Sequence, residues 1–312
     1  MGGAARIQGV ARVMIWRMRF AAVYIRHLAI TIALLMGLPP AIAGAAPPPG
    51  YKLVWHDEFD RLSVGDPGSG ARWLPYFARF NVRYLAGNED KGFKMADGEA
   101  ISSGATVRDA LKQQRSWPLH EIVDGALVLR AFPLSPALSP NFSGFPYIAS
   151  MASGEQQHAQ LYGYWEVRLR LDNLSRGQHF TSWLLPADGG WPPEIDMLEV
   201  IGNEPDTLYI NGMGAKPNVP ITRRRVPHLT HNWLTVGFLW SPETMRWTLN
   251  GQTVREQPNF IDRQKLYFLM TWEIADRWTG PPDAATVWPA QVSVDYVRIY
   301  QAVDGTESGR GE

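Results

Sequence analysis

The sequence predicts an all-β protein built as an antiparallel β-sandwich, and three observations favour this fold class. Apolar residues alternate with charged ones through 165–171, the pattern of a strand with one buried face. Asn250-Gly251 separates two strand-like runs, and both residue types tolerate the positive φ of a two-residue hairpin turn. The 29 glycines and 24 prolines divide the chain into short segments, with no long amphipathic helical pattern between them.

Residues 1–46 have the pattern of an export signal followed by the start of a short Pro-rich junction. Several arginines precede an apolar run at 28–38, and small residues follow it. A run of about 11 apolar residues is short for a membrane span, which needs about 20. We therefore expect cleavage after Ala43, Ala45 or Ala46, a secreted or periplasmic product, and no stable membrane association after cleavage. The alternative is an uncleaved membrane anchor.

Residues 47–302 are predicted to form one domain, and the polar residues 303–312 a disordered tail. A hydrophobic content of 45% can bury one large core. Cysteine is absent, so the fold must be stable without disulfides and has no thiolate metal site. The 30 basic and 30 acidic residues balance, which leaves no electrostatic signature of nucleic-acid binding. We expect a monomer without a nucleic-acid partner.

Three carboxylates lie within six residues, in the run Glu194-Ile195-Asp196-Met197-Leu198-Glu199. Side chains alternate faces along a strand, so Glu194 and Asp196 share one face and Glu199 would point to the other. A β-bulge near Met197-Leu198 would return Glu199 to the first face, and such bulges are common beside active sites. The spacing therefore predicts a bulged strand with three acids lining one cleft.

This arrangement suits glycosidic bond cleavage. A retaining glycosidase needs two carboxyl groups about 5 to 5.5 Å apart, and an inverting one leaves a larger gap for water. Same-face positions on a strand lie only about 6.6 Å apart, so we predict retention of anomeric configuration. Crowding separates the proton affinities of the acids, which provides an acid and a base together. The spacing alone leaves open which glutamate is the nucleophile. The alternative, a solvent-facing edge strand, is disfavoured by the apolar and aromatic flanks of the run.

The chain resembles glycoside hydrolase family 16, in the branch whose active strand reads E-x-D-x-x-E. The resemblance extends over residues 51–301 and includes four further segments in the family's order. These are LVWHDEFD at 53–60, DGALVL at 124–129, YGYWEVR at 162–168 and VDYVRIY at 294–300.

The resemblance implies a concanavalin-like jelly roll with the substrate cleft on its concave sheet and a catalytic domain at 47–302. It also implies roles for the three acids: Glu194 as nucleophile, Glu199 as general acid/base, and Asp196 as the residue that tunes the nucleophile. Two carboxylates and water complete the reaction, so no cofactor is required. The family allows a structural calcium ion, but no acidic loop with convincing ligand spacing is visible here.

The 13 tryptophans are a second sign of carbohydrate binding, because sugar rings stack their C–H faces on flat aromatic rings. Four of them lie near the acids or in segments that line the family's cleft, and two polar residues lie in a family loop that contacts substrate. The alternatives are core packing for the tryptophans and a solvated loop for the polar pair. The predicted substrate-binding residues are Trp183, Trp191, Trp272, Trp278, Arg83 and Asn88, with Trp183 and Trp278 preferred as platforms.

Several positions depart from the family pattern. Met213 stands where many members carry a histidine, and 269–275 replaces the commoner N-L-A-x-G-G run. The arginines at 223–225 either hold an anionic or acyl-substituted polysaccharide or form a solvated loop. The histidines show no zinc-ligand spacing, so we interpret His179, among others, as an ordinary surface or cleft residue.

These features predict a retaining endo-β-glycosidase that hydrolyses internal β-1,3 or mixed β-1,3-1,4 linkages of a β-glucan or exopolysaccharide by double displacement. Its expected partner is therefore a polysaccharide substrate. Three alternatives stay open: a transglycosylase on the same scaffold, a galactan hydrolase acting on agar or carrageenan, and a non-catalytic glycan-binding module.

Overall fold

The computed structural model describes residues 47–303 except 67, 78–106, 143 and 215–219. These residues belong to one compact unit, Gly44–Glu312. The predicted export signal and the C-terminal tail from 304 onward lie outside the described residues. Within the described part of the chain, no helix is both long and apolar enough to cross a membrane.

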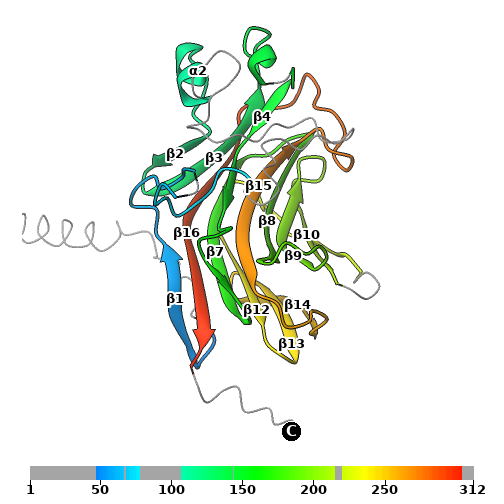
Figure 1. Cartoon of the computed structure of the whole chain (residues 1–312). Coiled ribbons are helices and arrows are strands. Elements are labelled where there is room, and N and C mark those ends of the chain that lie inside the picture. Colours follow the sequence, from blue (N-terminus) through cyan, green and yellow to red (C-terminus); the bar gives the residue numbers. More distant parts are fainter. Residues whose placement is uncertain (1–46, 67, 78–106, 143, 215–219, 304–312) are drawn as a thin grey trace, which may run out of the picture. The chain divides into compact units, whose positions relative to one another are not determined.

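Two antiparallel sheets make up the fold (Figure 1), which confirms the all-β sandwich. The nine-stranded sheet has the order β14-β13-β12-β7-β16-β3-β2, with β1 beside β16 and β4 beside β3. The seven-stranded sheet has the order β11-β10-β9-β8-β15-β5, with β6 beside β15. One short helix, α2 (Val107–Gln113), and one 3₁₀ turn, η1 (Ser139–Phe142), accompany the described strands.

The strands of the nine-stranded sheet have the following bounds: β1 (Tyr51–Asp57), β2 (His120–Val123), β3 (Ala126–Pro133), β4 (Tyr147–Ala149), β7 (Gly163–Asn173), β12 (Leu234–Trp240), β13 (Thr244–Leu249), β14 (Gln252–Pro258) and β16 (Ala290–Ala302). Those of the seven-stranded sheet are β5 (Met151–Ser153), β6 (Ala159–Gln160), β8 (Gln178–Pro186), β9 (Glu194–Ile201), β10 (Thr207–Met213), β11 (Thr222–Arg225) and β15 (Leu266–Ile274).

The core between the sheets follows the alternation seen in the sequence. On β7 the four apolar residues Trp165, Val167, Leu169 and Leu171 are at most 1% exposed and belong to the main hydrophobic cluster. The predicted hairpin is also confirmed, because Asn250 and Gly251 join β13 to β14 with φ of 49° and 77°.

The chain crosses from one sheet to the other at Ser150. Strand β4 pairs with β3 of the nine-stranded sheet, and β5 pairs with β15 of the seven-stranded sheet. Ser150 N–H donates to the Arg130 carbonyl, and its own carbonyl accepts from Trp272 N–H, at 2.9 and 3.1 Å. This crossing fixes β15, one of the strands that carry the candidate site.

Candidate active site

Strand β9 contains the bulge that the sequence predicted. On the β8 side, Trp183 lies opposite Asp196 and Ser182 lies opposite Leu198, so one step on β8 spans two on β9. On the β10 side, two steps from Tyr209 to Asn211 span three on β9, from Glu199 to Asp196. Both neighbouring strands therefore show one extra residue between Asp196 and Glu199.

The bulge separates the side chains of β9 into two faces. Ile195, Met197, Leu198 and Val200 are at most 1% exposed and pack in the core. Asp196 and Glu199 point away from that core, as does Glu194, which lies opposite Met213 on β10. We call this second side, which carries the three carboxylates, the acid face of the seven-stranded sheet. Because the consecutive residues Met197 and Leu198 both pack in the core, the side chain of Glu199 returns to the acid face.

Trp247 on strand β13 of the nine-stranded sheet contacts the backbone of β9 at the bulge. Its indole Nε1–H donates to the backbone carbonyl of Asp196 at 3.1 Å, and the side chain is 1% exposed. A bulge interrupts the ladder of backbone hydrogen bonds, so a buried carbonyl there needs another donor. Trp247 therefore links the core of the sandwich to the position of the acids.

Trp247→Phe is expected to lower kcat and to destabilise the fold by about 1–3 kcal/mol, since the buried Asp196 carbonyl loses its indole donor. Trp165→Phe is the matched control, because Trp165 is equally buried but its indole nitrogen has no hydrogen-bond partner among the described residues. Urea unfolding and steady-state kinetics on both variants provide the comparison. Equal losses of kcat in the two variants would contradict a role for Trp247 in placing the bulge.

The acids perturb one another. Burial, together with the charges of Glu199 and Glu273, raises the pKa of Glu194 to about 7 against the opposing effect of a hydrogen bond from Trp191. Burial first, then the charges of Glu199 and Glu194, raise the pKa of Asp196 well above its usual value. The protonated form of Asp196 is therefore favoured over what an exposed aspartate would show, and a protonated carboxyl group can donate a hydrogen bond to a neighbouring carboxylate.

Three of the four predicted tryptophan platforms surround the acids. Trp191 is 60% exposed, and its Nε1–H donates to Glu194 Oε2 at 2.9 Å. Trp183 is half-buried on β8, directly opposite Asp196. Trp278 is 39% exposed and packs edge-to-face on Tyr209, with ring centroids 4.7 Å apart, where Tyr209 lies opposite Glu199. Their partly exposed rings can meet a sugar bound over the acids.

The fourth prediction, Trp272 as a substrate contact, is wrong. Trp272 is fully buried, packs against Phe180 with ring centroids 5.2 Å apart, and donates from Nε1 to the Leu129 carbonyl of the other sheet at 3.1 Å. Alternation along β15 is the reason, because Thr271 and Glu273 occupy the acid face and Trp272 must then face the core. Arg83 and Asn88 lie outside the described residues.

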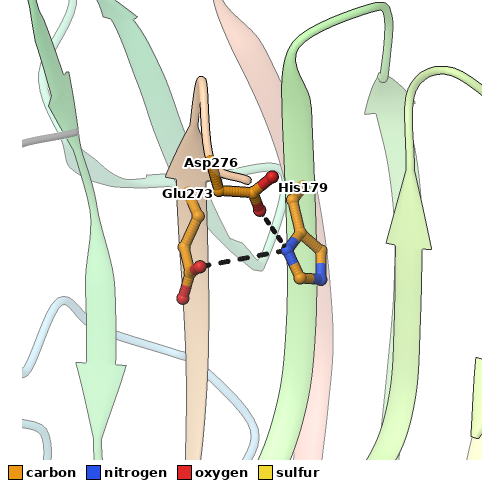
Figure 2. A group of neighbouring side chains, drawn as sticks. All are labelled: His179, Glu273 and Asp276. Atoms are coloured by element: carbon orange, nitrogen blue, oxygen red, sulfur yellow. Dashed lines mark hydrogen bonds and ion pairs between the residues drawn. The ribbon is translucent and has the colours of Figure 1, made fainter. Parts of the chain in front are cut away.

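His179 is the functional candidate that sequence reasoning missed. Its side chain on β8 is 8% exposed, and Nδ1 lies 2.7 Å from Asp276 Oδ2 and 3.9 Å from Glu273 Oε2 (Figure 2). Its Nε2 lies 3.5 Å from Glu199 Oε1. The interpretation of His179 as an ordinary residue is corrected: it lies between Glu273 of β15 and Asp276 of the following turn on one side, and Glu199 of β9 on the other. Its partner Asp276 lies 97 residues away in the chain, which is too far for a local spacing pattern to indicate.

His179, Glu273 and Asp276 could also be considered as metal ligands, since one ligand atom of each lies within 4.8 Å of the others. The short contact of Nδ1 with Asp276 Oδ2 has the length of a charge-assisted hydrogen bond. Calcium prefers an all-oxygen shell of six to eight ligands, which a histidine-containing triad does not offer. This cluster therefore does not match the structural calcium that the family resemblance allows.

Residues 143–296 match the family described as "Glycosyl hydrolases family 16". The chain belongs to this family. It is 28% identical over 251 residues to the Rhizobium meliloti protein "Endo-1,3-1,4-beta-glycanase EglC", covering 78% of this chain and 50% of that protein. It is 24% identical to the "Beta-glucanase" of Rhodothermus marinus, covering 82% and 87%. The chain spans about half the length of EglC and of a second Rhizobium meliloti relative, ExsH.

Solved structures show the same family 16 fold. The "non-specific endo-beta-1,3(4)-glucanase" SCLam superposes with a TM-score of 0.66 at 22% identity, covering 83% of this chain and 94% of that one. The laminarinase from Rhodothermus marinus superposes with a TM-score of 0.64 at 23% identity, covering 81% and 98%. These likenesses confirm the jelly-roll sandwich.

Proposed function

We propose that this family 16 member is a retaining endo-β-glycosidase that hydrolyses internal β-1,3 or mixed β-1,3-1,4 linkages of a β-glucan or exopolysaccharide. The observation that carries the proposal is the bulged strand β9, which presents Glu194, Asp196 and Glu199 on one face. The relatives named above, which include a glucanase and a 1,3-1,4-β-glycanase, support the same substrate class.

In the proposed reaction, the ionised Glu194 attacks the anomeric carbon while Glu199 protonates the departing glycosidic oxygen. A covalent glycosyl-enzyme forms, and Glu199, now a carboxylate, accepts a proton from the water that hydrolyses it. Asp196, whose pKa is raised by burial, shares the face of Glu194 and is the residue proposed to tune the nucleophile. Trp183, Trp191 and Trp278 supply aromatic surfaces for the sugar chain.

A transglycosylase would use the same residues and differ only in the acceptor that attacks the glycosyl-enzyme. A galactan hydrolase would differ in subsite contacts, which Met213 opposite Glu194 is placed to alter. A binding module without catalysis is disfavoured, because burying Asp196 and Glu199 opposes folding and binding alone does not require them. On the pattern of residues 1–46, we further propose a secreted or periplasmic monomer that needs no cofactor for the chemistry.

The test is reducing-sugar release by the purified protein from laminarin, lichenan, agarose, carrageenan and an acidic exopolysaccharide, with and without EDTA. We expect cleavage of a β-1,3 or mixed-linkage β-glucan or the exopolysaccharide, unchanged by the chelator. Transfer products in place of free reducing ends would support the transglycosylase, and cleavage of agarose or carrageenan alone would support the galactan hydrolase. Binding without any cleavage or transfer would contradict an enzyme.

A further inference from the structure

The His179–Asp276 pair lies beside Glu199 but has no part in the reaction as described so far. The two side chains are 8% and 7% exposed, and 2.7 Å separates Nδ1 from Oδ2 (Figure 2). An N–H···O contact of this length is typical of a charge-assisted hydrogen bond. Nδ1–H therefore donates to Asp276, and Nε2 points toward the other residues of the acid face.

Asp276 is held rigidly in the turn that follows β15. Its Oδ1 accepts the backbone N–H groups of Trp278 and Thr279 and the Thr279 hydroxyl, at 2.9, 2.7 and 2.8 Å. Burial alone would raise the pKa of Asp276, but the interactions with His179 and Thr279 outweigh it and lower the pKa to about 2. A fixed, ionised carboxylate of this kind keeps the hydrogen on Nδ1 and fixes the orientation of the ring.

The Nε2 side of the ring meets the candidate acid/base. Nε2 lies 3.0 Å from Thr181 Oγ1 and 3.5 Å from Glu199 Oε1, while Thr181 and Glu199 lie directly opposite each other. Burial would lower the pKa of His179, but its bonds to Asp276 and Glu199 and the charge of Glu273 raise it well above its usual value. A raised pKa favours the imidazolium, in which Nε2–H is a donor shared by the Thr181 hydroxyl and Glu199 Oε1.

The two oxygens of Glu199 thus differ. Oε1 faces the imidazolium, whereas Oε2 is buried and has no hydrogen-bond partner among the described residues. A carboxyl group bonded at one oxygen carries its acidic proton on the other. The oxygen without a partner is therefore the one available to a substrate atom.

We propose that His179, fixed by Asp276, is a positioning residue that holds Oε1 of Glu199 so that Oε2 is the oxygen that exchanges protons with the substrate. The inference rests on the proposed function. In the first step the Oε2 proton moves to the glycosidic oxygen as the C1–O bond breaks, and in the second step Oε2 takes a proton from the attacking water. His179 keeps its own protons throughout and acts only on the placement of Glu199.

This role predicts a dependence on the leaving group. A polysaccharide leaving group needs protonation, whereas dinitrophenolate leaves without it, so misplacing the acid should affect only the first substrate. For His179→Gln and Asp276→Asn, we expect kcat/KM on the β-glucan to fall about 10- to 100-fold, within the range assigned to general acid catalysis. On a dinitrophenyl β-oligoglucoside, we expect the first, glycosylation step to stay within about threefold of wild type.

The measured quantity is the ratio of the two kcat/KM values in one preparation, because that ratio cancels any loss of folded enzyme. His120→Gln is the matched control, since His120 is 3% exposed and bonds the Met151 carbonyl at 2.8 Å. Its ratio should equal the wild-type ratio. A wild-type ratio in both His179→Gln and Asp276→Asn would overturn the inference while leaving the proposed function intact. Absence of activity in the wild-type enzyme would instead contradict the proposed function.

Discussion

Glu194→Gly is expected to lower kcat/KM on the polysaccharide by a factor on the order of 10⁴ or more, because the covalent route is lost with the nucleophile. Glu199→Gly is expected to lower it about 10²- to 10⁴-fold, the range for a lost general acid. Both losses depend on the bulge that places these side chains on one face. Steady-state kinetics on both variants measures the size of the effects.

Rescue by azide then distinguishes the two roles, which the spacing of the glutamates alone could not. With a dinitrophenyl β-oligoglucoside, azide should replace the missing nucleophile in Glu194→Gly and attack the anomeric carbon directly, which gives an α-glycosyl azide. In Glu199→Gly, azide should instead attack the glycosyl-enzyme and give a β-glycosyl azide. Glu256→Gly is the control, since Glu256 lies on β14 of the nine-stranded sheet and pairs with Arg246 of β13. The opposite stereochemistry in the two variants would exchange the assigned roles.

The bulge was predictable from the sequence because a simple rule connects residue spacing to the face of a strand. Three acids at positions 194, 196 and 199 cannot share a face unless one extra residue intervenes, and the register with β8 and β10 shows that residue. The alternation on β7 and the Asn250-Gly251 turn were predictable in the same way, from local periodicity and from tolerance of positive φ.

The errors arose where function depends on contacts between distant strands. Trp272 looked like a platform because of its residue type, but the register of β15 with β8 turns it toward the core beside Phe180. His179 looked ordinary because its partners Glu273 and Asp276 are far along the chain, and only the pairing of β8 with β15 brings them together. Local patterns indicate which face a side chain occupies, but not which distant side chain it meets there.

Glu194→Gln is expected to stabilise the folded protein at pH 8 although it abolishes activity. The pKa of Glu194 is raised from 4.5 to about 7, chiefly by burial, so the folded state binds this proton more tightly than the unfolded state does. The free energy of unfolding therefore falls as pH rises from about 4.5 to about 7, and the deficit persists above that range. The difference between a pKa of 4.5 and one of about 7 corresponds to at most about 3.5 kcal/mol.

Glutamine resembles the protonated acid and can still accept the hydrogen bond from Trp191 Nε1, so the variant escapes this penalty. Thermal unfolding should show a Tm about 5–10 °C above wild type at pH 8, and no difference at pH 4, where Glu194 is protonated in both the folded and the unfolded state. Glu204→Gln is the control, and its change in Tm at pH 8 should have the opposite sign, because the pKa of Glu204 is lowered, chiefly by a hydrogen bond from Tyr209. An equal gain at both pH values would show that lost charge at Glu194 is not the cause. A gain at pH 8 alone would instead show that the surroundings of Glu194 destabilise its ionised form. A carboxylate destabilised in this way is favoured to attack a sugar.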